Sequence, residues 1–517
     1  MSEYIICLGP SLLVPQPKSA KVKCNELFER HYPCIIMVSS LLLVAAGAAT
    51  VSAAPNLRPR AGASSHCSSS DGTYKLSSFD APVSGDGNAN GMSTWQLTID
   101  DTSAGHKQQI TGFGAAVTDA TVSVFNSLSE SDQSRLLSEL MTGSGADFSL
   151  MRHTIASSDL SGDPAYSYDD NGGNVDTSLG SFNLGDRGNA MASLLAKMRG
   201  LKSGLTILGS PWSAPGWMKL NGVLTGTTVN NNLNPSYRDS FARYFVKYLQ
   251  AFSKAGAHVD AITIQNEPLN SQAGHPTMYV YEDESGDIIN QNVGPALAAA
   301  GLDTKVWAYD HNTDVPSYPQ TVLDKASAYV PAVAWHCYAT NTDWGTLTDF
   351  HNKNPDKLQY MTECWTSPQT GWSAAADFTM GPLQNWASGA MAWTLGSDVT
   401  YGPHLSSGGC DACRGLFVVD TSTRTYSFAI DYYIMAQFSR YMPKGAIVLA
   451  GTGSYSYGDG SGIQSVATLN PDGTRTVVIT NKFGNDVYIT VTAKSGDKWS
   501  GRVYQNSVVT WVLPASG

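Results

Sequence analysis

The stretch DAITIQNEP, residues 260–268, decides how this chain is expected to fold. It is an apolar β-type run that ends in the polar residues Gln265, Asn266 and Glu267. Seven further runs of this kind occur, and longer polar or helical stretches separate them. They are QQITGFGAA (108–116), DFSLMRHT (147–154), GLTILGSPW (204–212), TKVWAYDHN (304–312), VPAVAWHCY (330–338), QYMTECW (359–365) and GAMAWTL (389–395). Eight alternating strand and helix units predict an α/β fold, a (β/α)8 TIM barrel, which we place at residues 109–424.

Amphipathic segments predict helices between these strands. Apolar residues recur at helical spacing in residues 190–200 and, most strongly, in residues 237–256. A third helix is expected to open near Leu128 and to run through Met141, with Ser129 as its N-cap. Such helices form the outer ring of a barrel of this type.

The helical pattern fades after about residue 425. The segments that follow alternate between apolar and polar residues, are separated by turns such as NPDGT and KSGDK, and predict a β-sandwich over residues 425–517. They are GIQSVATLN (462–470), RTVVITNKF (475–483), DVYITVTA (486–493) and VVTWVLPA (508–515). We expect strands within residues 73–108 to join the same sandwich.

The N-terminal region predicts a leader over residues 1–54. An apolar run from Ile35 to Ala54 ends in small residues, as a signal peptide does before its cleavage site. The alternative is a membrane anchor, because the run is nearly long enough to cross a bilayer. Met37 is a candidate for the true initiator. Residues 55–72 are rich in Ser, Pro and Arg and predict a flexible pro-segment or linker, so we expect a secreted, extracellular protein with no membrane segment in its mature form.

The composition is that of a folded, acidic protein. Of 517 residues, 42% are hydrophobic and 15% are charged, which suits a chain with a large core. The formal net charge of −11 offers no basic surface for nucleic acid.

Five cysteines lie beyond the leader, so a monomer keeps at least one unpaired thiol even if secretion permits disulfides. The CxxC spacing of the last two favours a loop disulfide, because no second CxxC or HxxxH completes a zinc site. The five are Cys67, Cys337, Cys364, Cys410 and Cys413.

A glutamate stands at the C-terminal end of two predicted strands. Glu267 ends the fourth strand, and Glu363 ends the seventh. Barrel enzymes carry catalytic groups at these ends, and barrel closure brings the fourth and seventh strands to facing sides of the mouth. Glycoside hydrolysis needs one protonated carboxyl and one ionised carboxyl, so the pair predicts a glycosidase, with Asn266 placed to hydrogen-bond the sugar 2-hydroxyl. The alternative is that both glutamates are rim carboxylates in surface loops.

Longer motifs surround the pair and span nearly the whole mature chain. They are GFGAAVTDA from Gly112, MRHTIASSDLSGDPAYSYDD (151–170), SPWSAPGWMK (210–219), ITIQNEP (262–268) and YMTECW (360–365). In these motifs the chain resembles glycoside hydrolase family 30 and, within it, the fungal endo-β-1,6-glucanases. The resemblance implies a barrel with a β-sandwich built from both termini, a retaining mechanism, and neither metal nor cofactor. It also implies that Glu267 is the acid/base and Glu363 the nucleophile.

The resemblance carries further roles onto matching positions. It implies that Arg152 braces the carboxylate of the nucleophile and that Asp159 accepts hydrogen bonds from sugar hydroxyls. Trp212 is expected to line the pocket of the attacked sugar, and Trp393 to form its floor. These residue types suit those roles, because Arg forms a fork with a carboxylate and a Trp face packs on the CH face of a pyranose.

Five more positions are less specific. His336 and Tyr338, which flank Cys337 in WHCY, are expected by resemblance to point at the nucleophile or the sugar, although His336 could instead be a core histidine. Trp217 is as consistent with packing as with the site. Asp119 and Asp310 are expected to hold loops together rather than to touch substrate.

The function that the sequence favours is endo-hydrolysis of β-1,6-glucan by a secreted, monomeric enzyme through a glycosyl-enzyme intermediate. Within the family, the alternatives are a glucosylceramidase-like, β-xylanase or β-1,6-galactanase activity. One alternative outside the family's activities is a carbohydrate-binding wall protein on an inactive barrel, which the intact glutamate pair argues against. Another is a metallohydrolase, for which the chain offers no HExxH motif or paired His/Asp cluster.

Overall fold

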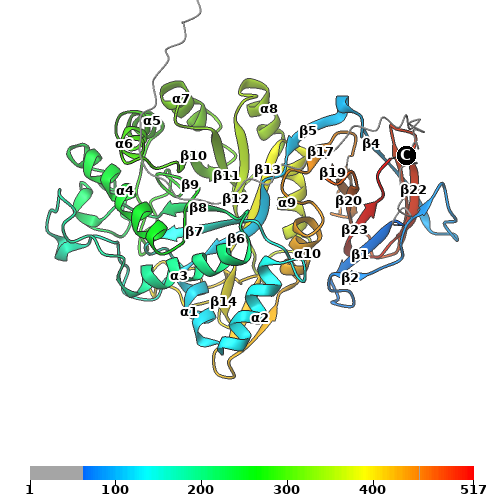
Figure 1. The fold of residues 1–517 in the computed structure, drawn as a ribbon, viewed down its shortest axis with the longest axis horizontal. Coiled ribbons are helices and arrows are strands. Elements are labelled where there is room, and N and C mark those ends of the chain that lie inside the picture. The colour runs from blue at the N-terminus through cyan, green and yellow to red at the C-terminus, as the bar shows by residue number, and fades with distance from the viewer. Residues whose placement is uncertain (1–61, 453, 517) are drawn as a thin grey trace, which may run out of the picture. The chain divides into compact units, whose positions relative to one another are not determined.

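The computed structural model describes residues 62–452 and 454–516. In this part of the chain, eight parallel strands close into a barrel in the order β10-β11-β12-β13-β6-β7-β8-β9, with helices packed around them (Figure 1). The strands are β6 (Gly112–Val117), β7 (Leu150–Ile155), β8 (Thr206–Pro211), β9 (Ala261–Ile262), β10 (Lys305–Asn312), β11 (Ala332–His336), β12 (Leu358–Trp365) and β13 (Ala387–Trp393). The predicted TIM barrel is confirmed, and each strand falls on a predicted run.

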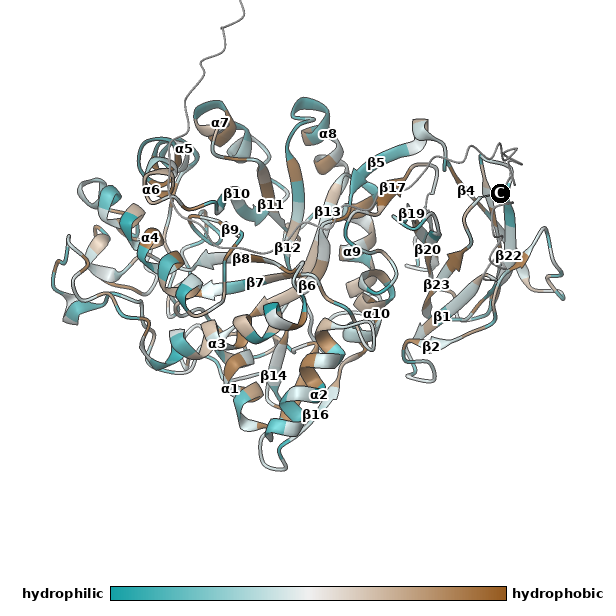
Figure 2. Ribbon diagram, in the orientation of Figure 1, coloured by the Kyte–Doolittle hydropathy of each residue, from teal (hydrophilic) through white to brown (hydrophobic). Residues whose placement is uncertain are grey.

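The barrel helices lie in the connections between strands. They are α1 (Asp119–Ser127), α2 (Glu130–Met141), α3 (Gly185–Leu201), α4 (Arg238–Lys254), α5 (Glu282–Ile288), a π-helical segment (Ile289–Val293), α6 (Gly294–Ala299), α7 (Ser317–Ala326), α8 (Gly345–Lys353) and α9 (Ala374–Gln384). Ser129 caps α2 as predicted, since its side chain accepts a hydrogen bond from the backbone N–H of Asp132. The polar faces of α4 and α8 contrast with the more apolar barrel strands in Figure 2.

The barrel interior is filled by side chains from seven of its strands. Trp307 of β10 stacks on Tyr360 of β12 with ring centroids 4.1 Å apart. The rest of this buried layer is Leu150, Leu208, Ala261, Ala332, Ala334 and Met391. Because these residues precede the strand ends, they close the barrel from below, and the polar residues of the site lie above them at the C-terminal mouth.

Two further sheets form the β-sandwich. One has the order β2-β1-β23-β20-β19-β17-β5, with β18 beside β19, and the other has the order β3-β22-β21-β4. Their strands are β1 (Ser64–Ser69), β2 (Ser77–Ser78), β3 (Val83–Ser84), β4 (Ser93–Ile99), β5 (His106–Gln109), β17 (Ile447–Leu449), β18 (Ser454–Ser456), β19 (Gly462–Leu469), β20 (Arg475–Asn481), β21 (Val487–Ala493), β22 (Lys498–Val503) and β23 (Ser507–Leu513). The sandwich is thus built from both ends of the described chain, as the resemblance implied.

The flexible segment expected over residues 55–72 is wrong for residues 64–69. These residues form β1, which lies between β2 and β23 in the sheet. Their Ser-rich sequence has no strand-like apolar pattern, but the strand pairs along its length with β23, and Ser68 Oγ donates to the Tyr433 carbonyl at 3.1 Å. Residues 1–61, and with them the expected leader, lie outside the described part of the chain.

The sandwich boundary expected at residue 425 is too early. Strands β14 (Gly396–Asp398), β15 (Phe417–Asp420) and β16 (Thr425–Phe428) form a small separate sheet, and helix α10 (Ile430–Ser439) follows. Phe438 of α10 packs near Phe113 of β6, with ring centroids 6.2 Å apart, within the barrel's core cluster. This helix carries almost no polar face, which is why its sequence lacks the amphipathic pattern that marks the earlier helices.

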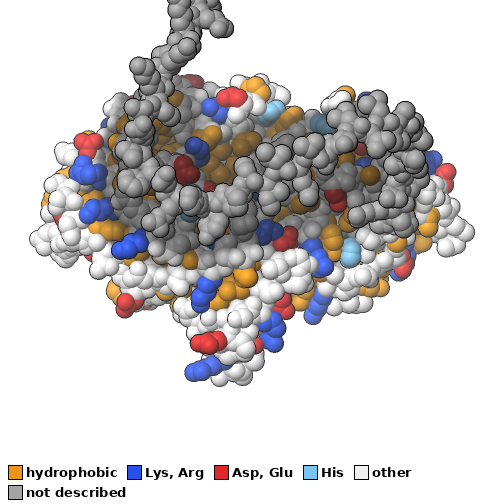
Figure 3. Space-filling view, viewed as in Figure 1, with side chains coloured by type: hydrophobic (Ala, Val, Ile, Leu, Met, Phe, Trp, Pro, Cys, Tyr) orange, Lys and Arg blue, Asp and Glu red, His pale blue; other side chains and the backbone are white. Residues whose placement is uncertain are grey.

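Two observations concern the charge on the surface and the length of the helices. On the face in Figure 3, Lys and Arg side chains lie among Asp and Glu side chains and form no continuous basic stripe. Within the described residues, no helix has the length and apolar character needed to span a membrane.

Candidate active site

The C-terminal mouth of the barrel holds an open cleft of about 570 Å³. Glu267 lies just beyond β9 and Glu363 lies in β12, on opposite sides of the closed barrel. His336 Nδ1 is 3.1 Å from Glu267 Oε1 and 3.9 Å from Glu363 Oε1. The two carboxylate oxygens are therefore no farther apart than 3.1 plus 3.9, or 7.0 Å. The predicted residues that line the cleft are Asp159, Trp212, Asn266, Glu267, Tyr338, Glu363 and Trp393.

Arg152 is fully buried beneath the cleft and joins its two sides. Its Nη1 donates to Glu363 Oε2, and its Nη2 donates to Asn266 Oδ1 and, at 2.8 Å, to Asp310 Oδ2. One planar guanidinium thus fixes the carboxylate of Glu363 and the residue next to Glu267. This is the contact that the sequence resemblance implied for Arg152.

Asp310 joins strand ends beneath the cleft rather than a loop, so the loop-holding role expected for it is wrong, although, as expected, it does not line the cleft. It is fully buried and accepts hydrogen bonds from Ser210 Oγ, Thr263 Oγ1 and Thr362 Oγ1, each at 2.8 Å. Burial raises its pKa, but the neighbouring Arg152 charge and the other donors outweigh this and hold the pKa well below its ordinary value. Asp310 therefore stays charged and anchors the cationic side chains around it.

Asp119, by contrast, occupies the loop-holding position expected of it. It accepts hydrogen bonds from Ser161 Oγ at 2.7 Å and from Tyr166 Oη at 3.1 Å. Trp217 is buried, and its indole N–H donates to the backbone carbonyl of Asp169 at 2.9 Å, which makes it a packing residue.

His336 and Tyr338 approach different glutamates. The ring of His336 is fully buried, with Nδ1 facing Glu267 and Nε2 at 2.9 Å from Asp310 Oδ1. It therefore points mainly at the Glu267 side of the cleft. Tyr338 Oη donates to Glu363 Oε1 at 3.0 Å.

An aromatic wall and an orphan carboxylate complete the predicted set. Trp212 and Trp393 stack with centroids 5.0 Å apart, and the Arg152 guanidinium carbon lies 4.9 Å and 5.9 Å from their rings. Asp159 Oδ1 is buried without a hydrogen-bond partner in the described chain. Burial, together with the charges of Glu363 and Glu267, raises the pKa of Asp159 to about 8.

The imidazole of His336 influences the pKa values of both glutamates. Burial raises the pKa of Glu363, and the charges of His336 and Arg152 only partly offset the rise. Burial also raises the pKa of Glu267, but the histidines His311 and His336 outweigh it and hold the pKa well below its ordinary value. Burial lowers the pKa of His336, yet Glu363 and the bonds to Asp310 and Glu267 raise it to about 9. In the free protein the mobile proton therefore lies on His336, one hydrogen bond from Glu267.

Two side-chain groups in the described chain place potential metal-ligand atoms within 4.8 Å of one another. In the group that contains His336, both ring nitrogens of this histidine already face carboxylates. In the group that contains Cys410 and Cys413, the two sulfurs are bonded to each other. Neither group presents a free ligand set for a resident metal, and catalysis without metal stays a prediction. The groups are Glu267, His311 and His336, and Asp159, Cys410 and Cys413.

Two family models match consecutive parts of this chain. The glycosyl hydrolase family 30 TIM-barrel domain matches residues 110–442, and the family 30 β-sandwich domain matches residues 445–511. The chain belongs to glycoside hydrolase family 30. The family that the sequence motifs indicated is thereby confirmed, and the chain is a glycoside hydrolase.

Relatives in family 30 resemble the chain over most of its length. The endo-1,6-β-D-glucanase of Aspergillus fumigatus is 64% identical and covers 93% of this chain and 100% of its own length. The endo-1,6-β-D-glucanase of Neurospora crassa is also 64% identical, over 87% of this chain and 95% of its own. A solved structure of an endo-β1,6-glucanase has a TM-score of 0.77 at 28% identity and covers 88% of this chain and 100% of its own.

The family 30 cleft also contains side chains that the sequence analysis did not select. Asn270 Nδ2 donates to Glu267 Oε2 at 2.7 Å. His311 Nδ1 lies 3.7 Å from Glu267 Oε1. The available signal was the polar cluster after each strand, Asn270 shortly after NEP and His311 in YDHN, but neither position has a motif of its own.

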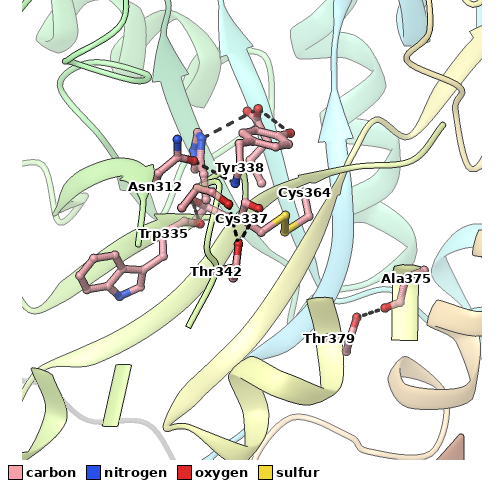
Figure 4. Close-up of a disulfide and its surroundings, with 12 residues drawn as sticks. Asn312, Trp335, Cys337, Tyr338, Thr342, Cys364, Ala375 and Thr379 are labelled. Atoms are coloured by element: carbon pink, nitrogen blue, oxygen red, sulfur yellow. Dashed lines mark hydrogen bonds and ion pairs between the residues drawn. A yellow bond between two sulfur atoms is a disulfide. The ribbon is translucent and has the colours of Figure 1, made fainter. Parts of the chain in front are cut away.

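Disulfides flank the family 30 site. Cys337 and Cys364, which directly follow His336 and Glu363, are bonded and join the ends of β11 and β12 (Figure 4). Cys410 and Cys413 are bonded in a loop that lines the cleft, in agreement with their CxxC spacing. Cys67 is buried and has no disulfide partner among the described residues.

Proposed function

We propose that this chain is a secreted, retaining endo-β-1,6-glucanase, with Glu267 as acid/base and Glu363 as nucleophile. The observation that carries the proposal is 64% identity to the A. fumigatus endo-1,6-β-D-glucanase over that relative's whole length. The geometry is compatible with retention. Retaining carboxyls stand roughly 5–5.5 Å apart and inverting ones roughly 6.5–9.5 Å, and the upper bound of 7.0 Å between Oε1 of Glu267 and Oε1 of Glu363, from 3.1 plus 3.9, admits the retaining separation.

The first half-reaction transfers a glucosyl unit to the enzyme. A carboxylate oxygen of Glu363 attacks the anomeric carbon while the bond to the C6 oxygen of the departing sugar breaks. Glu267 gives that oxygen a proton, so the sugar leaves as a neutral alcohol. That proton comes from His336, at 3.1 Å, which passes it to Glu267 before the bond breaks, so Glu267 is a carboxylate once the sugar has left. Arg152 and Tyr338 each hold one oxygen of Glu363 and fix the angle of attack.

The second half-reaction returns the enzyme to its starting state. Glu267, now a carboxylate, takes a proton from a water that attacks the same anomeric carbon. The bond to Glu363 breaks and its carboxylate is restored against Arg152. Two inversions at one carbon give net retention of the β configuration.

Product analysis on defined polysaccharides tests this proposal. The purified chain is incubated with pustulan, xylan, galactan and a glucosyl lipid, and the first anomer released is followed by NMR. We expect gentio-oligosaccharides from pustulan, with the β anomer appearing first. Xylo-oligomers without gentio-oligosaccharides would place the enzyme among the xylanases, and an α anomer appearing first would exclude retention.

Chemical rescue tests the assignment of the acid/base. Glu267→Ala removes the proton donor and the base but leaves the nucleophile, so azide is expected to restore part of the turnover as a β-glycosyl azide product. Substrates with good leaving groups should also retain more activity than the polysaccharide does. Absence of both rescues, in a variant that melts like the wild type, would assign the proton to another residue.

Secretion is tested on the protein that the cell produces. We propose that residues 1–54 act as a leader, because their apolar run ends in small residues. N-terminal sequencing of enzyme from the culture medium is expected to begin beyond Ala54. Enzyme found only in the cell or membrane fraction, with the leader intact, would contradict this part of the proposal.

A further inference from the structure

Strand β10 departs from regular geometry where it reaches the cleft. Tyr309 and Asp310 have positive φ values of 80° and 63°, in the left-handed region that residues with a Cβ rarely adopt. The pairing register with β11 shifts between Tyr309 and His311. Two consecutive left-handed residues in a buried strand form a bulge that its surroundings must enforce, and such bulges are concentrated beside active sites.

The bulge brings two consecutive side chains to the same site. In a regular strand Asp310 and His311 would point to opposite faces. Here Asp310 Oδ2 is 2.8 Å from Arg152 Nη2, while His311 Nδ1 is 3.7 Å from Glu267 Oε1. Because of the bulge, β10 supplies both the carboxylate that pairs with Arg152 and the His311 ring that faces Glu267.

The same bulge is bonded to the backbone of the acid/base. The N–H of Glu267 donates to the Asp310 carbonyl at 3.0 Å. Glu267 itself has a positive φ of 46°. The position of Glu267 along the cleft is therefore tied to β10 through its main chain, in addition to the approach of His311 to its side chain.

His311 has the surroundings of a donor rather than of a packing residue. Its side chain is 12% exposed and lines the cleft. Its Nδ1 is buried and has no hydrogen-bond partner in the described chain. Its ring meets His336 edge to face, with centroids 6.3 Å apart. A buried ring nitrogen without a partner is uncommon, and here it faces an oxygen just beyond hydrogen-bond range.

We propose that His311 is a positioning residue for Glu267: Nδ1–H closes on Glu267 Oε1 when the departing sugar is bound and aims the carboxyl at the leaving oxygen. The inference rests on the proposed role of Glu267 as acid/base. His336 holds the same oxygen from the buried side, at 3.1 Å, and Asn270 holds Oε2 at 2.7 Å. His311 would add a third contact to the Glu267 carboxyl, from the side of the open cleft, and would thereby orient it toward the substrate.

A matched pair of variants separates this role from packing. His311→Asn keeps a side-chain N–H close to the place of Nδ1, whereas His311→Gln places its amide near Nε2. The activity of each, and of His311→Leu, is measured on a glucan, whose alcohol leaving group needs a proton, and on an aryl glycoside with an acidic phenol, which does not. His258→Leu, at a partly exposed histidine paired with Asp303, is the control.

The leaving group decides the outcome. We expect His311→Leu to lower kcat/KM on the glucan by roughly 10- to 100-fold, within the range of general acid catalysis, and to change the aryl glycoside much less. Asn should restore most of the loss and Gln little of it. Equal losses on both substrates, or rescue by Gln as complete as by Asn, would overturn the proposal.

The result is independent of the linkage. If the wild type cleaves a glycan other than β-1,6-glucan, the proposed function fails, but the alcohol-to-phenol ratio on that glycan still tests His311. If Glu267→Ala shows no leaving-group dependence, the acid/base assignment fails first, and the proposal for His311 is overturned with it.

Discussion

Two fully buried arginines hold this molecule together in different ways. Arg152 lies in the barrel mouth and pairs with Asp310 and Glu363. Arg475 lies in the sandwich strand β20 and pairs with Asp101 at 2.7 Å and Asp497 at 2.6 Å. Both are less than 2% exposed. Burial and ion pairing alone therefore do not tell an arginine at the candidate active site from a structural one.

The surroundings make the difference. Arg475 also donates to the Pro514 carbonyl at 3.0 Å, so it joins the N-terminal strands of the sandwich to the last one. Around Arg152, by contrast, Glu363 opens onto a cleft, Asp159 keeps an orphan oxygen, and the strand that carries Asp310 is left-handed at two residues. Strained backbone beside a cavity marks the cluster around Arg152, whereas an unpaired polar atom alone does not, because Arg475 Nε is also buried without a partner among the described residues.

The largest expected difference between the two arginine clusters follows from removing the carboxylate charge that pairs with Arg152. Glu363→Gln keeps the shape of the side chain but removes the nucleophile, so we expect turnover to fall about 10⁴-fold or more. Binding of oligosaccharide, measured by calorimetry, should persist. Turnover within a few fold of the wild type would refute the nucleophile assignment, and Asp497→Asn in the sandwich cluster serves as the matched control.

The second test replaces each arginine by lysine. A single ammonium cannot reproduce the fork that Arg152 extends to Glu363, Asn266 and Asp310, so we expect Arg152→Lys to lower kcat roughly 10²- to 10³-fold. Arg475→Lys should lower Tm but leave kcat per folded molecule unchanged. Disrupting either buried pair costs about 3–5 kcal/mol at most. A similar loss of kcat in both variants would mean that the two clusters do not differ in function.

The third test concerns the proton on His336 and the pH dependence of kcat/KM. With a pKa of about 9, His336 keeps a proton next to Glu267 on the alkaline side of neutrality. As pH rises through that value the proton is lost, and kcat/KM should fall. In His336→Asn, Glu267 must hold the proton alone, so the basic limb of the pH profile should move to lower pH, with about a 10- to 100-fold loss above neutrality. An unmoved limb would show that His336 does not share the catalytic proton.

The same contrast explains what could be predicted from the sequence. The barrel and both glutamates could be predicted because each strand is apolar and each carboxylate stands at a strand end, a position that the fold itself makes catalytic. Arg152 and the two cleft tryptophans needed the family motifs, since an isolated Arg or Trp in a strand carries no such signal.

The misses have a common physical cause. The polar segment 64–69 became a strand through pairing with β23, a partner distant in sequence. Helix α10 lost its amphipathic signal because it is buried on nearly every side. Asp310 and His311 both reach the site only because a bulge breaks the alternation of β10, and left-handed φ values at non-glycine residues are imposed by tertiary contacts that a local pattern does not contain.

The smallest expected effect concerns Asp159, where one substitution should raise stability and lower activity. Since the pKa of Asp159 is raised to about 8 from 3.8, the folded protein holds a proton there that the unfolded chain releases. That group's contribution to stability is fully present below pH 3.8 and is lost as pH rises toward 8. Asp159→Asn mimics the neutral acid, so we expect a Tm gain near neutral pH that vanishes in acid, with kcat/KM lowered less than about 10-fold. Asp159→Ala should cost more, roughly 10- to 100-fold, because a sugar hydroxyl loses its partner. If Asn proved as damaging as Ala, the sugar would require the ionised carboxylate, and the orphan oxygen of Asp159 would be a charge held for substrate rather than a neutral group.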